Sequence, residues 1–69
     1  MNTVISQQIG KYTVLIYSSG HKFWHLNGEL HREDGPAIEY KEYSYWFLNN
    51  KNYPNIKSVE ELIIASIIK

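Results

Sequence analysis

The sequence predicts a mostly β domain of the α+β class, an antiparallel meander of two repeated β-hairpin units packed with one C-terminal helix. Three observations lead to this prediction. An aromatic segment followed by an asparagine turn occurs twice, at residues 24–28 and 46–50. Short runs of β-branched and aromatic residues alternate with Gly, Ser and Asn turns, a pattern typical of hairpins. The segment Val59–Lys69 combines apolar residues at helical spacing with helix-start signals.

The first unit is expected to form around a tight turn. Asn27-Gly28 favours a type I′ turn, which requires positive φ at both central residues. Upstream, Val4–Ile5 is interpreted as a short strand or a loose lead-in that Gly10 ends. β-branched and aromatic side chains dominate the neighbouring segments. The strands expected for this unit are Thr13–Tyr17, Lys22–Leu26 and Glu29–His31.

The second unit and the helix follow in order. Asn49-Asn50 is the second expected turn, because asparagine tolerates the left-handed conformation. Ser58 lies three residues before Glu61, the spacing of a capping box at a helix start. Pro54-Asn55 separates the β part from the helix. The strands expected here are Ala37–Tyr40, Ser44–Leu48 and Lys51–Tyr53.

The two units are unequal copies of one sequence. Trp24-His25-Leu26-Asn27-Gly28 corresponds to Trp46-Phe47-Leu48-Asn49-Asn50, 22 residues further along. A single hairpin cannot bury its own apolar face, whereas two hairpins side by side can. We therefore expect a single domain over residues 1–69, with the repeats in 14–53 and the helix in 58–69, and with the Trp and Leu positions in the core.

Composition narrows the function classes. The 69 residues carry seven basic and seven acidic side chains, singly dispersed, which disfavours nucleic-acid binding. Cysteine is absent, so thiol catalysis and thiolate metal sites are excluded, and a reducing compartment is favoured. The longest apolar stretch is too short to span a bilayer. We expect a cytoplasmic, non-enzymatic protein without a metal or a cofactor.

Residues 24–37 carry a family resemblance. Their sequence, WHLNGELHREDGPA, resembles the MORN-like repeat W-x-x-N-G-x-x-H-R-x-D-G-P-A, with a complete first copy and a partial second copy over Val14–Tyr53. Such repeats occur in small phage and giant-virus proteins and in some bacterial ones. The resemblance implies the hairpin unit. Its setting implies a phage-encoded accessory protein that binds and inhibits a bacterial host protein, for instance one in defence.

Strand alternation separates the candidate partner-binding residues from the core. Phe23 and His25 share the face opposite Trp24, and Tyr45 and Phe47 share the face opposite Trp46. One helix covers one face, so these four side chains are predicted to form an apolar surface that binds a protein partner, unless the sheet curls over them.

The helix offers a second apolar surface. One stripe, predicted to face the sheet, contains Val59, Leu62, Ile63 and Ile67. Ile64 and Ile68 fall outside this stripe and are predicted to mediate self-association. A homodimer that packs helix or sheet faces together is the oligomer we expect.

A polar cluster follows the first turn. Arg32 and Asp34 are interpreted as braces of the loop, because Asp34 can form an Asx turn. His31, Arg32 and Asp34, beside aromatic rings, are alternatively a site for a small signalling nucleotide, which would make the protein a nucleotide sponge. A structural assembly component is a third alternative.

Overall fold

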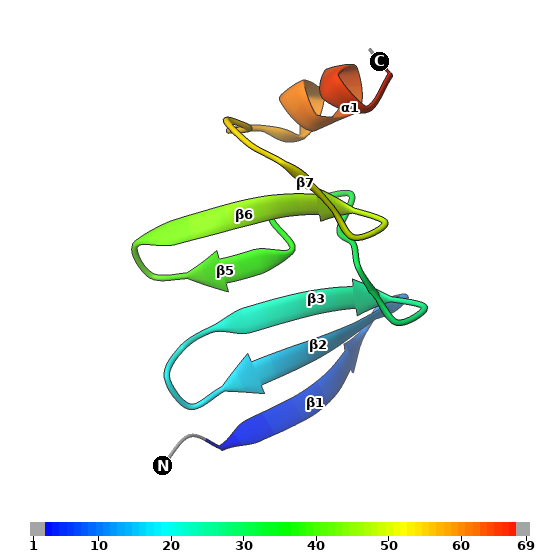
Figure 1. Ribbon diagram of the computed structural model, residues 1–69. Helices are drawn as coiled ribbons and strands as arrows, with labels where there is room; N and C mark the ends of the chain where they lie inside the picture. The colour runs from blue at the N-terminus through cyan, green and yellow to red at the C-terminus, as the bar shows by residue number, and fades with distance from the viewer. Residues whose placement is uncertain (1–2, 68–69) are drawn as a thin grey trace.

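In a computed structural model, which describes residues 3–67, the chain forms a seven-stranded antiparallel sheet followed by one helix (Figure 1). Neighbouring strands run in the order β1-β2-β3-β5-β6-β7, and β4 pairs with β3 off this path. The predicted α+β, mostly β, class is therefore confirmed. The elements are β1 (Val4–Ile9), β2 (Tyr12–Tyr17), β3 (Lys22–Leu26), β4 (Glu29–Leu30), β5 (Ile38–Tyr40), β6 (Tyr43–Leu48), β7 (Lys51–Tyr53) and α1 (Val59–Ile67).

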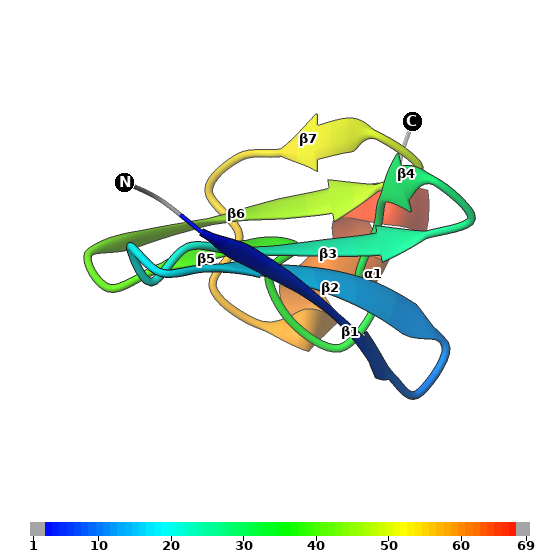
Figure 2. The same ribbon diagram turned by 90° about the horizontal axis from the view of Figure 1, so that it is seen from below.

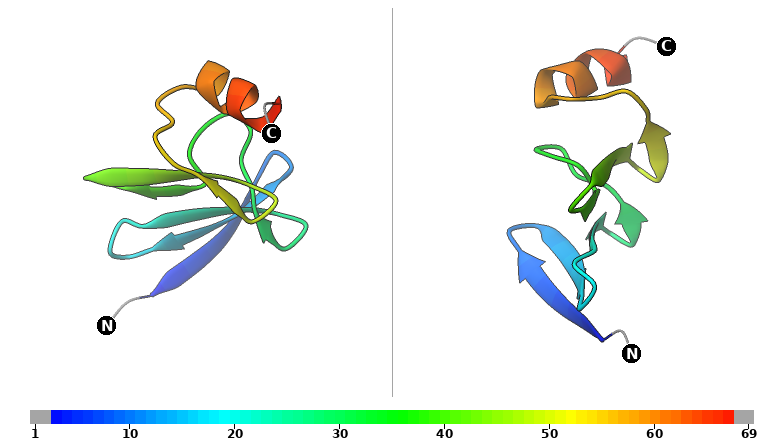
Figure 3. Two further views of the ribbon diagram at one scale, coloured as in Figure 1. Left: turned by 45° about the horizontal axis from the view of Figure 1, so that its top comes forward. Right: turned by 90° about the vertical axis from the view of Figure 1, so that its left-hand side faces the viewer.

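The hairpins are stacked along one direction, which makes the molecule elongated. Its principal extents are 41 × 26 × 16 Å. Figure 1 shows β1 at one end of the stack and α1 at the other, beyond β6 and β7. Figure 2 looks along the stack, with β1 in front and α1 behind the sheet, and the side view in Figure 3 shows the same order as Figure 1. The two ends of the stack are therefore different surfaces, a strand edge and a helix.

Both predicted asparagine turns are confirmed. Asn27 and Gly28 have φ angles of 52° and 82°, and Asn49 and Asn50 have 51° and 66°. Positive φ at both central residues is the requirement of a type I′ turn, whose twist matches that of the flanking strands. The same turn chemistry therefore closes β3–β4 and β6–β7, as expected of two copies of one unit.

The N-terminal strand is longer than the sequence indicated. β1 covers six residues, Val4–Ile9, and pairs with the whole of β2. The sequence did not indicate the full strand, because Ser6–Gln8 is polar and breaks the alternation of apolar residues. All six residues of β1 are exposed, so the fold does not require that alternation here. Gly10 is the first central residue of the β1–β2 turn, with φ 58° as in a type II′ turn, so it reverses the chain within a hairpin.

The core lies on one face of the sheet, which we call the core face. Cross-strand pairing places Val14 opposite Trp24, and the Trp24 amide donates to the Ala37 carbonyl at 2.7 Å. Trp24 and Trp46 are both buried, which confirms the predicted tryptophan positions, while Leu26 and Leu48 are half-buried. The buried apolar residues on this face are four strand residues and the residue before β5, namely Tyr12, Val14, Trp24, Trp46 and Ala37.

Phe47 corrects the predicted division of the two faces. It was expected on an exposed apolar surface, but it is half-buried and packs against the cluster formed by Tyr12, Val14, Trp24 and Ala37. Ala37 has the smallest side chain of that cluster. We attribute the approach of Phe47 to this small residue and to the twist that brings β6 against the return strand of the first unit.

Helix α1 packs against the rest of the protein mainly through one side chain, and not through the whole predicted apolar stripe. Leu62 is 1 % exposed, whereas Ile63 and Ile67, predicted to face the sheet, are 51 % and 71 % exposed. That part of the prediction is wrong, because α1 caps the end of the stack and does not lie across a sheet face (Figure 3). Val59 is half-buried and Ile64 is 56 % exposed. Ile68 lies outside the described residues.

The capping box at the start of α1 is present with one shift. Ser58 Oγ accepts a hydrogen bond from the Glu61 amide at 3.2 Å, as an N-cap residue does. The Glu61 carboxylate accepts from the amide of Lys57, one residue before the position that a standard box uses. Among residues 3–67, no helix is long and apolar enough to cross a membrane.

Candidate functional site

Arg32 is held at the centre of the first unit. Its guanidinium carbon lies 3.6 Å from the centroid of the Trp24 ring, a cation–π distance. Arg32 Nη1 donates to the Pro36 carbonyl at 3.2 Å, and Nε donates to Asp34 Oδ1 at 3.0 Å. Trp24 Nε1 donates to Glu39 Oε2 at 2.7 Å, and the same oxygen lies 3.3 Å from Arg32 Nη1. We call these groups the arginine clamp.

Gly35 closes the clamp from the other side. A Cβ atom at this position would lie 2.7 Å from Arg32 Cζ and 2.9 Å from Nη1. Gly35 does not have a positive φ, so the backbone itself does not demand glycine. The absence of a side chain therefore provides space for the guanidinium between the Gly35 backbone and the Trp24 ring. This packing gives a structural reason for Arg, Asp, Gly and Pro at their spacing in the loop.

His31 is buried between the two units. The Asn49 amide donates to His31 Nδ1 at 3.0 Å, so the proton of the neutral ring lies on Nε2 and is directed to Glu33 Oε2, 2.9 Å away. Glu33 also accepts from Lys11 Nζ at 2.9 Å. The hydrogen bond from Lys11, followed by the one from His31, lowers the pKa of Glu33 below its ordinary value.

Backbone hydrogen bonds join the same loop to the second unit. The Arg32 amide donates to the Phe47 carbonyl at 3.1 Å, and the Asn50 amide donates to the Leu30 carbonyl at 2.9 Å. Asn50 Oδ1 accepts from the Leu30 amide at 2.8 Å. The segment 30–34 is therefore the seam between the units. The predicted ligand-binding residues His31, Arg32 and Asp34 all make internal bonds within it.

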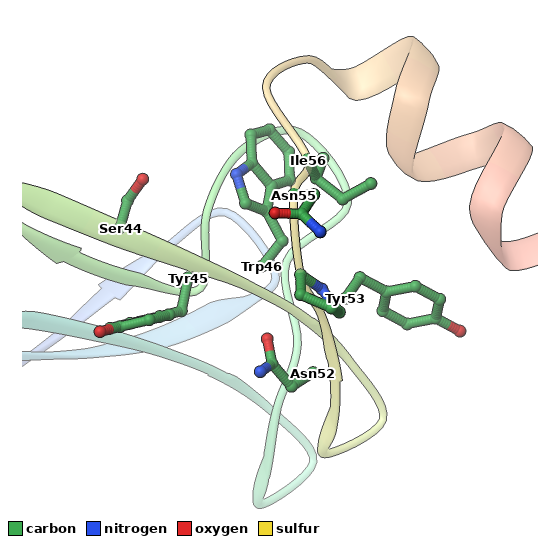
Figure 4. A pocket seen from close by; sticks show the side chains of 8 residues that line it. Ser44, Tyr45, Trp46, Asn52, Tyr53, Asn55 and Ile56 are labelled. Carbon is green, nitrogen blue, oxygen red and sulfur yellow. The ribbon is translucent and has the colours of Figure 1, made fainter.

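The second unit lacks an arginine clamp. Pro54 takes the place of Arg32, 22 residues further along, so no guanidinium covers Trp46 from that position. A cavity of about 250 Å³ lies beside Trp46, lined also by Ser44, Asn52, Pro54 and Ile56. Figure 4 shows Tyr45 and Trp46 leaving β6 on opposite sides. Tyr45 thus belongs to the face away from the core.

Six rings form a continuous row on that opposite face. Tyr17 and Phe23 lie 5.5 Å apart between centroids, and His21 stacks on Tyr40 at 3.8 Å with 12° between the ring planes. Tyr43 continues the row, 5.3 Å from Tyr40. We call this set the aromatic row. Its members are Tyr17, Phe23, His21, Tyr40, Tyr43 and Tyr45.

The aromatic row is accessible and ends in a hollow. Tyr43 and Tyr45 are each 46 % exposed. At the other end, Tyr17, His21 and Phe23 line a cavity of about 270 Å³ together with Ser19. The distance from Ser19 Oγ to His21 Nδ1 is 2.7 Å, which fixes the imidazole against Tyr40. A continuous row of rings with an open hollow provides both aromatic contact area and a place for an anchoring side chain.

The predicted partner-binding residues divide between two environments. Phe23 and Tyr45 belong to the aromatic row, and both lie opposite Ile38 in the pairing register. Phe47 packs against the core instead. His25 is half-buried, and its Nδ1 is a buried polar atom without a hydrogen-bond partner in residues 3–67.

Sequence reasoning missed Tyr17, His21, Tyr40 and Tyr43. Tyr17 and Tyr40 were recognisable as equivalent positions before the first turn of each unit. The link between these two tyrosines through Phe23 and His21 was not recognisable from the sequence, because it depends on the pairing of β3 with β5 across the long loop. In the described range 3–67, no cluster of three or more His, Cys, Asp or Glu side chains is arranged to hold a metal ion.

Comparison of the chain with family models, with curated proteins and with solved structures gives no match in any of the three. The function of the site is therefore argued from its geometry.

Proposed function

We propose that this protein is a small, non-enzymatic interaction module that binds another protein through the aromatic row. The observation that carries the proposal is the continuity of six rings in contact from Tyr17 to Tyr45, with exposed tyrosines at one end and a hollow at the other. Tyrosine supplies a large, rigid contact area at low cost in side-chain entropy. Aromatic residues are enriched at the centres of protein interfaces.

The chemistry of the row favours a protein over a nucleic acid. Single-stranded nucleic acids bind to stacked rings when a basic groove follows the backbone. This chain has a formal net charge of zero, and a single lysine over Tyr40, Lys41 at 5.9 Å from the ring centroid, does not make a basic groove. We therefore expect a partner that lays an apolar or aromatic side chain into the hollow at Tyr17 and Phe23 and covers Tyr43 and Tyr45 with neutral surface.

A narrower proposal comes from the MORN-like resemblance of residues 24–37. If the protein is phage-encoded, as this resemblance implies, its partner is a bacterial host protein and binding inhibits that protein. The arginine clamp supports a protein-binding role over a nucleotide-sponge role, because Arg32 is only 17 % exposed and its Nε and Nη1 already face Asp34, Pro36 and Glu39.

Site-specific photo-crosslinking tests the proposal. A benzophenone amino acid in place of Tyr45 is expected to capture a protein from a host lysate, whereas the same group in place of Ser44 is not. Ser44 is the matched control, because it is exposed on the same strand but lies on the core-face side, opposite Glu39. Capture of the same protein from both positions, or from Ser44 alone, would contradict the proposed surface.

The captured protein is then purified and titrated with variants. Tyr43→Ala and Tyr45→Ala are each expected to weaken binding at least about fivefold, since interface hot spots contribute more than about 1 kcal/mol. Ser44→Ala should leave the Kd unchanged. Equal affinities for all three variants would show that the partner binds elsewhere.

A further inference from the structure

The outer edge of β1 is open to pairing with another strand. All six residues from Val4 to Ile9 are exposed, and none carries a charge. The register with β2 runs without interruption from Val4↔Tyr17 to Ile9↔Tyr12, so no bulge twists the edge away. Long, uncharged edge strands without proline or bulges are the ones that pair with other chains.

The other end of the sheet has the protection that β1 lacks. β7 has three residues, begins with Lys51 and is followed by Pro54. Short length, lysine and proline are the usual means by which proteins block edge pairing. Helix α1 then follows at that end (Figure 1). Within residues 3–67, the β7 edge is blocked and no strand pairs with the outer edge of β1, which makes β1 the place for association.

The hydrogen-bond pattern tells which groups of β1 face outward. The Ser18 amide donates to the Thr3 carbonyl at 2.9 Å, so Thr3 and every second residue after it bond to β2. The amides and carbonyls of the residues between them point to the free edge. Those outward-facing residues are Val4, Ser6 and Gln8.

We propose that β1 pairs antiparallel with β1 of a second copy of this chain, around a two-fold axis at Gln7. An axis normal to the sheet keeps the core faces of both copies on one side. In this register Ser6 exchanges backbone hydrogen bonds with Gln8 of the partner subunit, and Gln7 lies opposite itself in a non-hydrogen-bonded pair. The sheet then continues through both copies.

Two features of β1 fit a second copy of itself. Ile5 and Ile9 lie on the core face, opposite Ile16 and Tyr12 of β2, and they are 66 % and 38 % exposed. In the proposed register Ile5 lies opposite the partner's Ile9, so the apolar residues of the two copies cover each other. In addition, a two-fold axis places a charged residue near the axis close to the same residue of the partner, which would repel it. β1 contains no charged residue, so its pairing with a second β1 meets no such repulsion.

Single cysteines test the pairing and its register, because the chain has none of its own. Gln7→Cys places two thiols across the axis, where the Cα atoms of a non-hydrogen-bonded pair lie about 4.5 Å apart, within disulfide range. Oxidation is expected to give a covalent dimer. Ser6→Cys is the matched control, because residue 6 lies opposite residue 8 and should crosslink far more slowly. Equal or faster crosslinking of Ser6→Cys overturns the register.

Light scattering over a dilution series tests the association itself. The wild-type chain should show a mass that rises to twice the monomer mass with concentration. Ser6→Pro removes an outward amide without breaking the β1–β2 ladder, and Gln7→Lys places two like charges at the axis. Both variants should remain monomeric with an unchanged circular dichroism spectrum, whereas the exposed control Ser44→Lys should still dimerise. A monomeric wild-type chain, or dimeric Ser6→Pro and Gln7→Lys variants, would overturn the proposal.

Discussion

At the residue scale, the polar loop after the first turn is explained by packing. Arg32 fits between the Trp24 ring and the Gly35 backbone, with a guanidinium–ring distance of 3.6 Å. A loop rich in His, Arg, Glu and Asp resembles a catalytic site in composition. Here each of these side chains bonds to another part of the loop or to the second unit. The cluster therefore stabilises the stacking of the units.

The arginine clamp gives the first prediction. Arg32→Ala and Gly35→Ala are each expected to lower the free energy of unfolding by about 1–3 kcal/mol, because the first removes the guanidinium and the second pushes it away from Trp24 and its hydrogen-bond partners. The double variant should lose clearly less than the sum, since both changes break the same clamp. Urea unfolding of the four proteins measures this coupling, and strictly additive losses would mean that Gly35 acts independently of Arg32.

Glu33 gives a prediction about pH. Lys11, and after it His31, lowers the pKa of Glu33 in the folded protein. The ionised carboxylate therefore stabilises the fold above its ordinary pKa, and this contribution is lost as the pH falls through the lowered value. Wild-type protein should have a slightly higher Tm than Glu33→Gln at neutral pH, and the difference should shrink in acid.

The expected effect of Glu33 is small, because its side chain is 54 % exposed and water screens the ion pair. Thermal unfolding from about pH 7 to about pH 3 measures it. The matched control is Glu42→Gln, at an exposed position in the β5–β6 turn. A Tm difference for Glu33→Gln that grows toward acid would contradict the direction of the pKa shift.

At the element scale, turns and strands followed from local chemistry, and the helix orientation did not. Both asparagine turns were predictable because asparagine and glycine tolerate positive φ. The strands around Trp24 and Trp46 were predictable from their side chains. The orientation of α1 depends on where the Pro54–Lys57 segment leads the chain, which is a tertiary effect. Apolar spacing within the helix therefore predicted Leu62 correctly and Ile63 and Ile67 wrongly.

The docking of α1 gives the next prediction. Leu62→Ala should lower the free energy of unfolding by about 2 kcal/mol or more, because it leaves a cavity at a side chain that is 1 % exposed. Ile63→Ala, the matched control one residue further along, should cost much less because it is 51 % exposed. Urea unfolding followed by far-ultraviolet circular dichroism measures both. A larger loss for Ile63→Ala would mean that the helix packs by its other side.

The candidate site was predictable in part, for a physical reason. Phe23 and Tyr45 followed from strand alternation, because both lie one residue before a core tryptophan. Tyr43, at the strand start, and His21, in a turn, did not follow, because their positions depend on the register between β5 and β6 and on the stacking with Tyr40. Phe47 was predicted to be exposed, but it is half-buried against the core cluster, a contact that strand alternation alone does not predict.

At the scale of the whole molecule, one face of the sheet carries the core that stabilises the fold, and the other carries the surface proposed to bind a partner. The core face carries the tryptophans, and the arginine clamp covers Trp24 beside it. The opposite face carries the aromatic row. A β1–β1 dimer would leave the row of each copy on the same side of one continuous sheet, so a dimer would present two binding surfaces to a partner.

The most direct test of the central claim is tyrosine footprinting of the complex with the captured partner. Mild nitration of the free protein should modify Tyr43 and Tyr45, which are each 46 % exposed. In the complex, both should be protected, while half-buried Tyr53, on β7 outside the aromatic row, keeps its free reactivity as the internal control. Full reactivity of Tyr43 and Tyr45 in the saturated complex would contradict the account.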